Sequence, residues 1–263
     1  MKTITFEPQS TQFSLKNAYA LALCSNLAYE SEKKIKKELA AHGFEATFIE
    51  RRETQCFVAC NDAAMVLAFR GTTNIQDWMT NSDVLLTGVR AGLGKVHGGF
   101  LRALCLVWDD ILQVLGAQQT KAQPLWITGH SLGGALATLA AARFVLEMDK
   151  PVNGVYTFGQ PRVGDREFAR LFNSEFKARQ FRFVNNNDIV TRVPSRELSY
   201  SHVGSMKFFD SDGELFDDIS WWNEFLESIK GSMKDQLDLI PANIENHKME
   251  RYINLIEQRL LQA

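Results

Sequence analysis

The chain is short of several features that would define its class at once. It holds only 4 cysteines, 6 prolines and 5 histidines in 263 residues. Its formal net charge is −2, so it has no basic field to hold a polyanion, and we expect no nucleic-acid partner. Hydrophobic residues make up 45% and charged residues 23%, which is ordinary for a globular protein and excludes disorder of the whole chain.

Long apolar runs are also missing. None approaches the roughly 18–20 residues that a membrane-spanning helix requires, so we expect no transmembrane segment. Glu7 and Pro8 lie where a secretion signal would need an apolar core, so we expect no signal peptide in this chain. The expected location is the cytoplasm, or outside the cell with a leader removed or by another route.

The few cysteines predict neither a disulfide nor a metal site. Cys56 and Cys60 fall in a predicted strand, where four residues span roughly 13 Å, too far for a disulfide. A zinc site would need a second such pair and histidines at ligand spacing, which the sequence lacks. We therefore expect buried free thiols and no metal.

Hydrophobic periodicity predicts an α/β fold. Strand patterns occupy residues 44–50, 55–60, 64–69, 125–128, 154–158, 179–184, 203–209 and 214–216. Helical patterns occupy residues 15–29, 32–42, 99–115, 132–147, 221–236 and 248–261. Because strands alternate with long helices, we predict a mainly parallel sheet covered on both faces, with antiparallel strands added early and late. No linker interrupts the pattern, so residues 1–263 are expected to form a single domain.

One local pattern carries chemistry. Residues 129–133, Gly-His-Ser-Leu-Gly, have the form G-x-S-x-G between a predicted strand and a predicted helix. There a sharp turn lifts the serine above the sheet, and side chains at the two glycine positions would collide with it. The amide of Leu132 would stand at the helix N-terminus, where free N–H groups stabilise negative charge. The pattern predicts Ser131 as a nucleophile; the alternative is a glycine-rich helix start that only packs tightly.

Around this motif the chain resembles the class 3 lipases, the fungal-type triacylglycerol lipase family of the α/β-hydrolases. The matching segments, in the expected order, are residues 69–78, 96–100, 129–135, 157–165 and 187–194. The likeness extends over roughly residues 13–260. It implies the α/β-hydrolase fold, with a lid segment near residues 74–94.

The resemblance also implies roles for single residues. Ser131 is the expected nucleophile and Asp188 the acid, while the amides of Thr72 and Leu132 are expected to form the oxyanion hole. The expected lid residues, which follow i, i+3, i+4 spacing, are Ile75, Trp78 and Met79. Such a mechanism requires no metal and no organic cofactor.

Two histidines follow Asp188 and compete for the role of general base. In this superfamily the order is nucleophile, acid, base, and the base is expected after the last major strand, here residues 203–209. His247 comes after that strand, on a loop that opens the final helix, whereas His202 precedes it. We therefore predict His247 as the base and His202 as a structural residue. His130 and His97 are also expected to be structural.

Together these residues predict a serine carboxylic ester hydrolase, most simply a triacylglycerol lipase that forms an acyl-enzyme. A phospholipase A1, a feruloyl or other polar-ester esterase, or an acyltransferase would use the same residues with another pocket and lid. A lipase-like scaffold without catalysis is the alternative of another class, although the residues whose loss would mark it are all present. The expected partner is an ester or lipid substrate, with transient lipid-interface contact through the lid.

Overall fold

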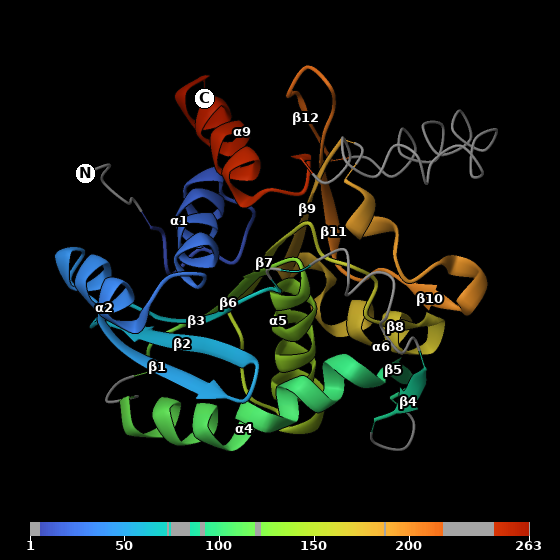
Figure 1. Cartoon of the computed structure of the whole chain (residues 1–263), viewed down its shortest axis with the longest axis horizontal. Coiled ribbons are helices and arrows are strands. Elements are labelled where there is room, and N and C mark those ends of the chain that lie inside the picture. The colour runs from blue at the N-terminus through green and yellow to red at the C-terminus, as the bar shows by residue number, and fades with distance from the viewer. Residues whose placement is uncertain are drawn as a thin grey trace.

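The computed structural model describes residues 6–72, 74, 85–89, 93–118, 122–186, 188–217 and 245–262. The described strands form a large and a small sheet (Figure 1). The large sheet contains β1 (Glu45–Arg51), β2 (Thr54–Cys60), β3 (Met65–Phe69), β6 (Leu125–His130), β7 (Gly154–Phe158), β9 (Gln180–Asn185), β11 (Ser205–Phe209) and β12 (Leu215–Phe216). The small sheet contains β4 (Leu86–Gly88), β5 (Lys95–His97), β8 (Gly164–Asp165) and β10 (Tyr200–Ser201). The α-helices are α1 (Leu15–Leu27), α2 (Glu32–Ala41), α4 (Gly98–Gln118), α5 (Leu132–Ala142), α6 (Arg166–Phe176) and α9 (Met249–Gln262).

The large sheet is mostly parallel. Its strand order is β1-β2-β3-β6-β7-β9-β11-β12. The strands from β3 to β11 run parallel, whereas β1, β2 and β12 are antiparallel to their neighbours. This confirms the predicted α/β class, including the early and late antiparallel additions.

Helices cover both faces of the sheet. Successive strand residues point to opposite faces. Ile127 and Val155 therefore pack with α4, α5 and α6, while Trp126 and Tyr156 pack with α1, α2 and α9. Figure 1 shows α1 beside α9, apart from α4 and α5. Because both faces are covered, β3 and β7 are buried at every residue, as parallel strands usually are.

The observed helices differ from the prediction in two places. α6 was not predicted, although Asp165 caps it by accepting the N–H of Phe168 at 2.8 Å and its buried face carries phenylalanines at i, i+4 spacing. α5 ends at Ala142 and continues as a π-helical turn, Arg143–Glu147, within the predicted helix 132–147. The helix predicted near residues 221–236 lies outside the described residues.

The last parallel strand is β11, as predicted, but it begins at Ser205 rather than at residue 203. Gly204 has φ 75°, so the chain turns before it enters the sheet. All four cysteines are free thiols. Among the described residues, no helix has both the length and the hydropathy of a membrane span.

Candidate active site

The turn between β6 and α5 holds Ser131 in a strained backbone conformation. β6 ends at His130, α5 begins at Leu132, and Ser131 between them has φ 57° and ψ −128°. This region costs a residue that carries a side chain ~1–3 kcal/mol, and such strain clusters at functional sites. The structure thus has the strand–turn–helix arrangement that the sequence motif predicts.

Two glycines allow the backbone segments of this elbow to touch. A Cβ atom at Gly129 would lie 2.2 Å from the carbonyl oxygen of Gly133. A Cβ atom at Gly133 would lie 2.3 Å from the carbonyl oxygen of Phe69, at the end of β3. Any side chain at either position would push α5 away from the strands, so the elbow requires glycine at both.

Asp188 and His247 form a buried pair next to the elbow. Nδ1 of His247 lies 2.8 and 3.0 Å from the two carboxylate oxygens of Asp188. Asp188 is fully buried and His247 is 5% exposed. Because a carboxylate only accepts hydrogen bonds, Nδ1 carries a hydrogen, so the tautomer that this contact favours has its lone pair on Nε2. That nitrogen is the atom that could take a proton.

Tyr252 of α9 completes the surroundings of Asp188. Its hydroxyl donates to Oδ2 of Asp188 at 2.6 Å and accepts the backbone N–H of Asn185 at 3.1 Å. Burial by itself raises the pKa of Asp188, but the positive charge that His247 carries when it is protonated and the hydrogen bonds from His247 and Tyr252 outweigh it and hold the pKa below its ordinary value. Asp188 is therefore ionised and can orient the imidazole. The sequence places Tyr252 only on an apolar helix face, and nothing local reveals its polar partner.

The elbow and the pair are joined through β7. The N–H of Ser131 donates to the carbonyl of Phe158 at 2.9 Å. The next residue, Gly159, has φ 58°, and a Cβ atom there would lie 2.7 Å from atoms of both Asp188 and His247. β7 thus binds the backbone of Ser131 through its last residue, and the residue after it, Gly159, lies against Asp188 and His247.

Two polar atoms remain open in this region. Oγ of Ser131 and Nε2 of His247 are both buried, and neither has a hydrogen-bond partner within the part of the chain that the structure describes. Buried polar atoms are usually paired, and an unpaired one is explained by strain, by a bound water or ion, or by a role in catalysis. An unpaired hydroxyl and an unpaired imidazole nitrogen, held at one site, are the groups that nucleophilic catalysis requires.

The predicted oxyanion residues lie at the same end of the sheet. β3 and β6 are neighbours, so the loop after Phe69 runs along the elbow; a Cβ atom at Gly71 would lie 2.6 Å from the carbonyl oxygen of His130. Thr72 follows, and its hydroxyl accepts the N–H of Asn74 at 3.2 Å. Leu132 is the first residue of α5, where helix N–H groups lack an intrahelical acceptor.

Two other histidines contact backbone away from the carboxylate of Asp188. Nε2 of His202 donates to the carbonyl of Thr191 at 2.8 Å. Nδ1 of His97 accepts two N–H groups at the start of α4, at 3.1 and 3.3 Å. The predicted lid residues Ile75, Trp78 and Met79 lie outside the described residues.

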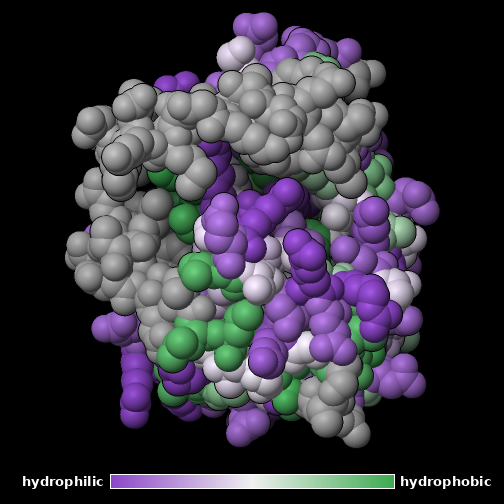
Figure 2. Space-filling model, turned by 90° about the vertical axis from the view of Figure 1, so that its right-hand side faces the viewer, coloured by the Kyte–Doolittle hydropathy of each residue, from purple (hydrophilic) through white to green (hydrophobic). Residues whose placement is uncertain are grey.

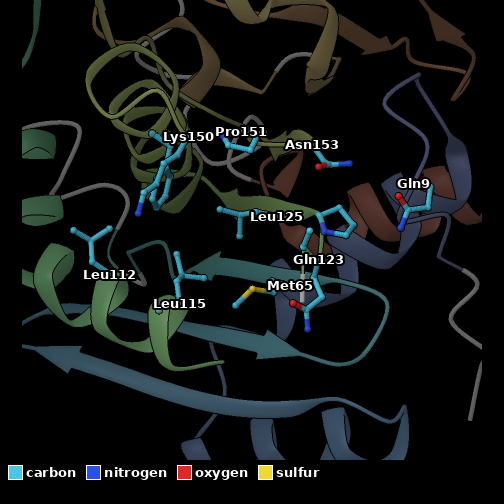
Figure 3. A pocket seen from close by; sticks show the side chains of 13 residues that line it. Gln9, Met65, Leu112, Leu115, Gln123, Leu125, Lys150, Pro151 and Asn153 are labelled. Carbon is cyan, nitrogen blue, oxygen red and sulfur yellow. The ribbon is translucent and has the colours of Figure 1, made fainter. Parts of the chain in front are cut away.

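A cavity of about 360 Å³ lies at the other end of the same strands (Figure 3). Its lining includes Met65 and Leu125, the first residues of β3 and β6, whereas Ser131 follows the last residue of β6. This cavity is therefore separate from the elbow, beside which the serine, the histidine and the acid lie together.

A strained serine elbow between strand and helix, an adjacent acid–histidine pair and a mostly parallel sheet between helices define the α/β-hydrolase class of protein. Within that class the chain belongs to the lipase (class 3) family, whose family model matches residues 66–198.

Similar proteins agree with this assignment. The chain is 32% identical over 252 residues to triacylglycerol lipase OBL1 of Arabidopsis thaliana, and the aligned region covers 72% of this chain and 48% of the relative. It is 27% identical over 220 residues to phospholipase A(1) DAD1 of the same plant, covering 73% of this chain and 49% of the relative. The chain spans about half the length of the curated relatives it matches. The triacylglyceride lipase structure of Rhizomucor miehei superposes with a TM-score of 0.64 and 26% identity, over 75% of this chain and 80% of that one.

Proposed function

We propose that this protein is a serine ester hydrolase that cleaves acylglycerols. The observation that carries the proposal is the buried Asp188–His247 pair beside the strained Ser131, with Oγ of the serine and Nε2 of the histidine both left without a partner among the described residues. Family membership supports acyl transfer to water as the reaction, because the class 3 lipase model matches the segments that hold Ser131 and Asp188.

The proposed chemistry begins with acylation. Nε2 of His247 takes the proton of the Ser131 hydroxyl while Oγ attacks the ester carbonyl, and the amides of Thr72 and Leu132 stabilise the oxyanion. The imidazolium then gives its proton to the leaving alcohol, and the acyl group stays on Ser131. Asp188 stabilises the imidazolium and keeps Nδ1 protonated throughout.

Deacylation repeats these steps with water. His247 takes a proton from a water molecule, whose oxygen attacks the acyl-enzyme, and returns the proton to Oγ of Ser131 as the fatty acid leaves. Each turnover consumes one water and restores the starting protonation states. Neither half of the reaction calls for a metal or an organic cofactor.

The acylglycerol substrate is proposed from the relatives named as triacylglycerol lipases. A phospholipase A1 activity is the second candidate, because the chain is also similar to a protein named phospholipase A(1). Both reactions would use Ser131, and they would differ in the head group that the site accepts.

We also propose that the segment near residues 74–94 acts as a lid that contacts lipid. The i, i+3, i+4 spacing of Ile75, Trp78 and Met79 supports it. Exposed leucines next to the small sheet agree: Leu85, directly before β4, is 67% exposed, and Leu198, two residues before β10, is 48% exposed. Figure 2 shows apolar side chains gathered on the side of the molecule that carries this sheet.

The test compares wild type with Ser131→Ala on emulsified triacylglycerol, diacylglycerol and phosphatidylcholine of one acyl chain length, with fatty-acid release as the readout. We expect acylglycerol cleavage that falls by more than roughly a thousandfold in the variant. More than a tenth of wild-type turnover in the variant would remove Ser131 as nucleophile. Faster release from phosphatidylcholine would favour the phospholipase, and no release from any ester would favour the scaffold without catalysis.

A further inference from the structure

His130, the residue before the nucleophile, contacts the loop that carries the base. Its Nε2 lies 2.6 Å from the backbone carbonyl oxygen of His247, and the two imidazole rings lie 4.4 Å apart between centroids. A carbonyl oxygen only accepts, so Nε2 of His130 carries the hydrogen. The two residues are 117 positions apart in the sequence.

The second nitrogen of His130 has its own partner. Nδ1 lies 2.8 Å from the hydroxyl of Tyr29, which follows α1. Burial lowers the pKa of His130 to about 3, so the ring is neutral at pH 7 and Nδ1 has no hydrogen. Tyr29 must therefore donate to Nδ1, and this bond fixes the tautomer that holds the His247 carbonyl.

Tyr29 in turn contacts the loop of the expected oxyanion hole. Its hydroxyl lies against the backbone of Gly71, whose N–H opposes the effect of burial on the pKa of Tyr29. A Cβ atom at position 71 would lie 2.2 Å from that hydroxyl, so the close approach requires glycine. The guanidinium carbon of Arg70 also lies 5.7 Å from the centre of the Tyr29 ring. Arg70 and Gly71 thus both contact the side chain of Tyr29.

These contacts form one continuous chain from Gly71 through Tyr29 and His130 to the carbonyl of His247. We propose that Tyr29 and His130 are positioning residues, which hold the base loop and the oxyanion loop in register with Ser131. Neither residue reaches the reacting atoms. The inference rests on the proposed function, because it concerns the same serine, histidine and oxyanion hole.

Other contacts hold the residue before His247 and the His247 imidazole ring, whereas His130 holds the His247 carbonyl. Asn185 donates its side-chain N–H to the carbonyl of Asn246 at 2.8 Å, which fixes one side of His247. Asp188 fixes the imidazole, but a ring that is held only through Nδ1 can still tilt about that bond. The bond from His130 to the His247 carbonyl fixes the backbone from which the ring extends, and small displacements of a catalytic group are costly in rate.

The test measures kcat and KM on a water-soluble p-nitrophenyl ester, because hydrolysis of a dissolved substrate does not depend on opening of the proposed lid at a lipid surface. His130→Ala should lower kcat by ~10- to 100-fold with KM unchanged, because it releases the His247 carbonyl. His130→Gln should restore most of that loss, since a glutamine amide can donate where Nε2 does. Tyr29→Phe, which removes a single oxygen, should lower kcat less than His130→Ala and cause little further loss when added to it.

Controls separate this inference from folding and from the proposed function. His202→Ala removes a histidine–carbonyl bond of the same kind and should keep kcat within threefold of wild type. Active-site titration with a phosphonate corrects every kcat for the folded fraction, and Tyr29→Phe still tests the chain should His130→Ala not fold.

Three results would overturn the positioning role: a His130→Ala kcat within threefold of wild type, a glutamine variant no faster than the alanine variant, or fully additive losses for the Tyr29 and His130 changes. If wild type itself were no faster than Ser131→Ala, the proposed function would be wrong instead.

Discussion

Acidification should destabilise this protein, because histidines that are buried and neutral in the folded state, His130 among them, bind a proton when the chain unfolds. Burial lowers the pKa of His130 to about 3 in the folded state, whereas an unfolded histidine titrates near ~6.5. Below pH ~6.5 the His130 side chain therefore binds a proton in the unfolded chain but not in the folded chain. The stability is lost progressively from about pH 6.5 down to about pH 3, at ~1.4 kcal/mol per pH unit. From pH 7 to pH 5 the share of His130 comes to about 2 kcal/mol.

The assay is urea unfolding at pH 7 and pH 5 for wild type and for His130→Gln. Glutamine does not titrate, and its amide can still donate to the carbonyl of His247. We expect the variant to lose about 2 kcal/mol less free energy of unfolding than wild type between the two pH values, whatever its stability at pH 7. Every other titrating group is common to both proteins, so the difference isolates His130. Equal losses in the two proteins would refute the reasoning and show that the folded state protonates His130 in this range.

The remaining predictions concern the site and the proposed lid. Tyr252→Phe removes the donor to ionised Asp188 and should lower the free energy of unfolding by ~1.5–3 kcal/mol in urea titrations at pH 7; a change below half a kcal/mol would contradict that bond. Gly159→Ala places a Cβ atom 2.7 Å from Asp188 and His247 and should lower kcat by roughly 100-fold. A variant with wild-type kcat would mean that the two side chains can shift without loss of activity. For the lid, the hydrolysis rate should jump where the substrate exceeds its solubility, and Trp78→Ser should weaken the jump. A smooth curve for both proteins would remove interfacial opening.

The elbow could be predicted because its causes are local. Gly129 and Gly133 are required by contacts within a few residues and with the end of one neighbouring strand, so five letters in a strand–helix context describe the geometry. The strands could be predicted for a similar reason, since burial on both faces leaves continuous apolar runs such as those of β3 and β7. α6 was missed although Asp165 and the phenylalanines give an N-cap and i, i+4 spacing.

The pairing of Asp188 with His247 depends on topology rather than on a local pattern. Chain order alone leaves His202 and His247 open, and the choice depends on where the last parallel strand ends. β11 lies where that strand was predicted, which puts His202 before it and His247 after it. The structure accordingly places His247 against the carboxylate and His202 against the Thr191 carbonyl.

The contacts around the site follow from no sequence pattern. Tyr252 reaches Asp188 across 64 residues, and Tyr29 reaches His130 across 101. Both contacts are hydrogen bonds between polar groups. The sequence pattern, however, places Tyr252 only on an apolar helix face and Tyr29 only at a helix end. A tyrosine is amphipathic, so its ring satisfies the apolar pattern while its hydroxyl remains free to bond elsewhere. Periodicity can therefore locate such residues in the core without showing what their hydroxyl groups do.

The serine and the histidine of the site are held in place in different ways. Ser131 is held by backbone sterics that β6 and α5 supply as soon as they pack. His247 depends on the docking of α9, because Tyr252 and Met249 of that helix are buried against α1 and the sheet while the loop before it carries His247. Loosening of α9 would therefore withdraw His247 and the Tyr252 hydrogen bond together, and it would leave the strained serine in place. A chain with an intact elbow and an undocked α9 would keep the proposed nucleophile without its proposed base, so docking of this helix is required to complete the proposed site.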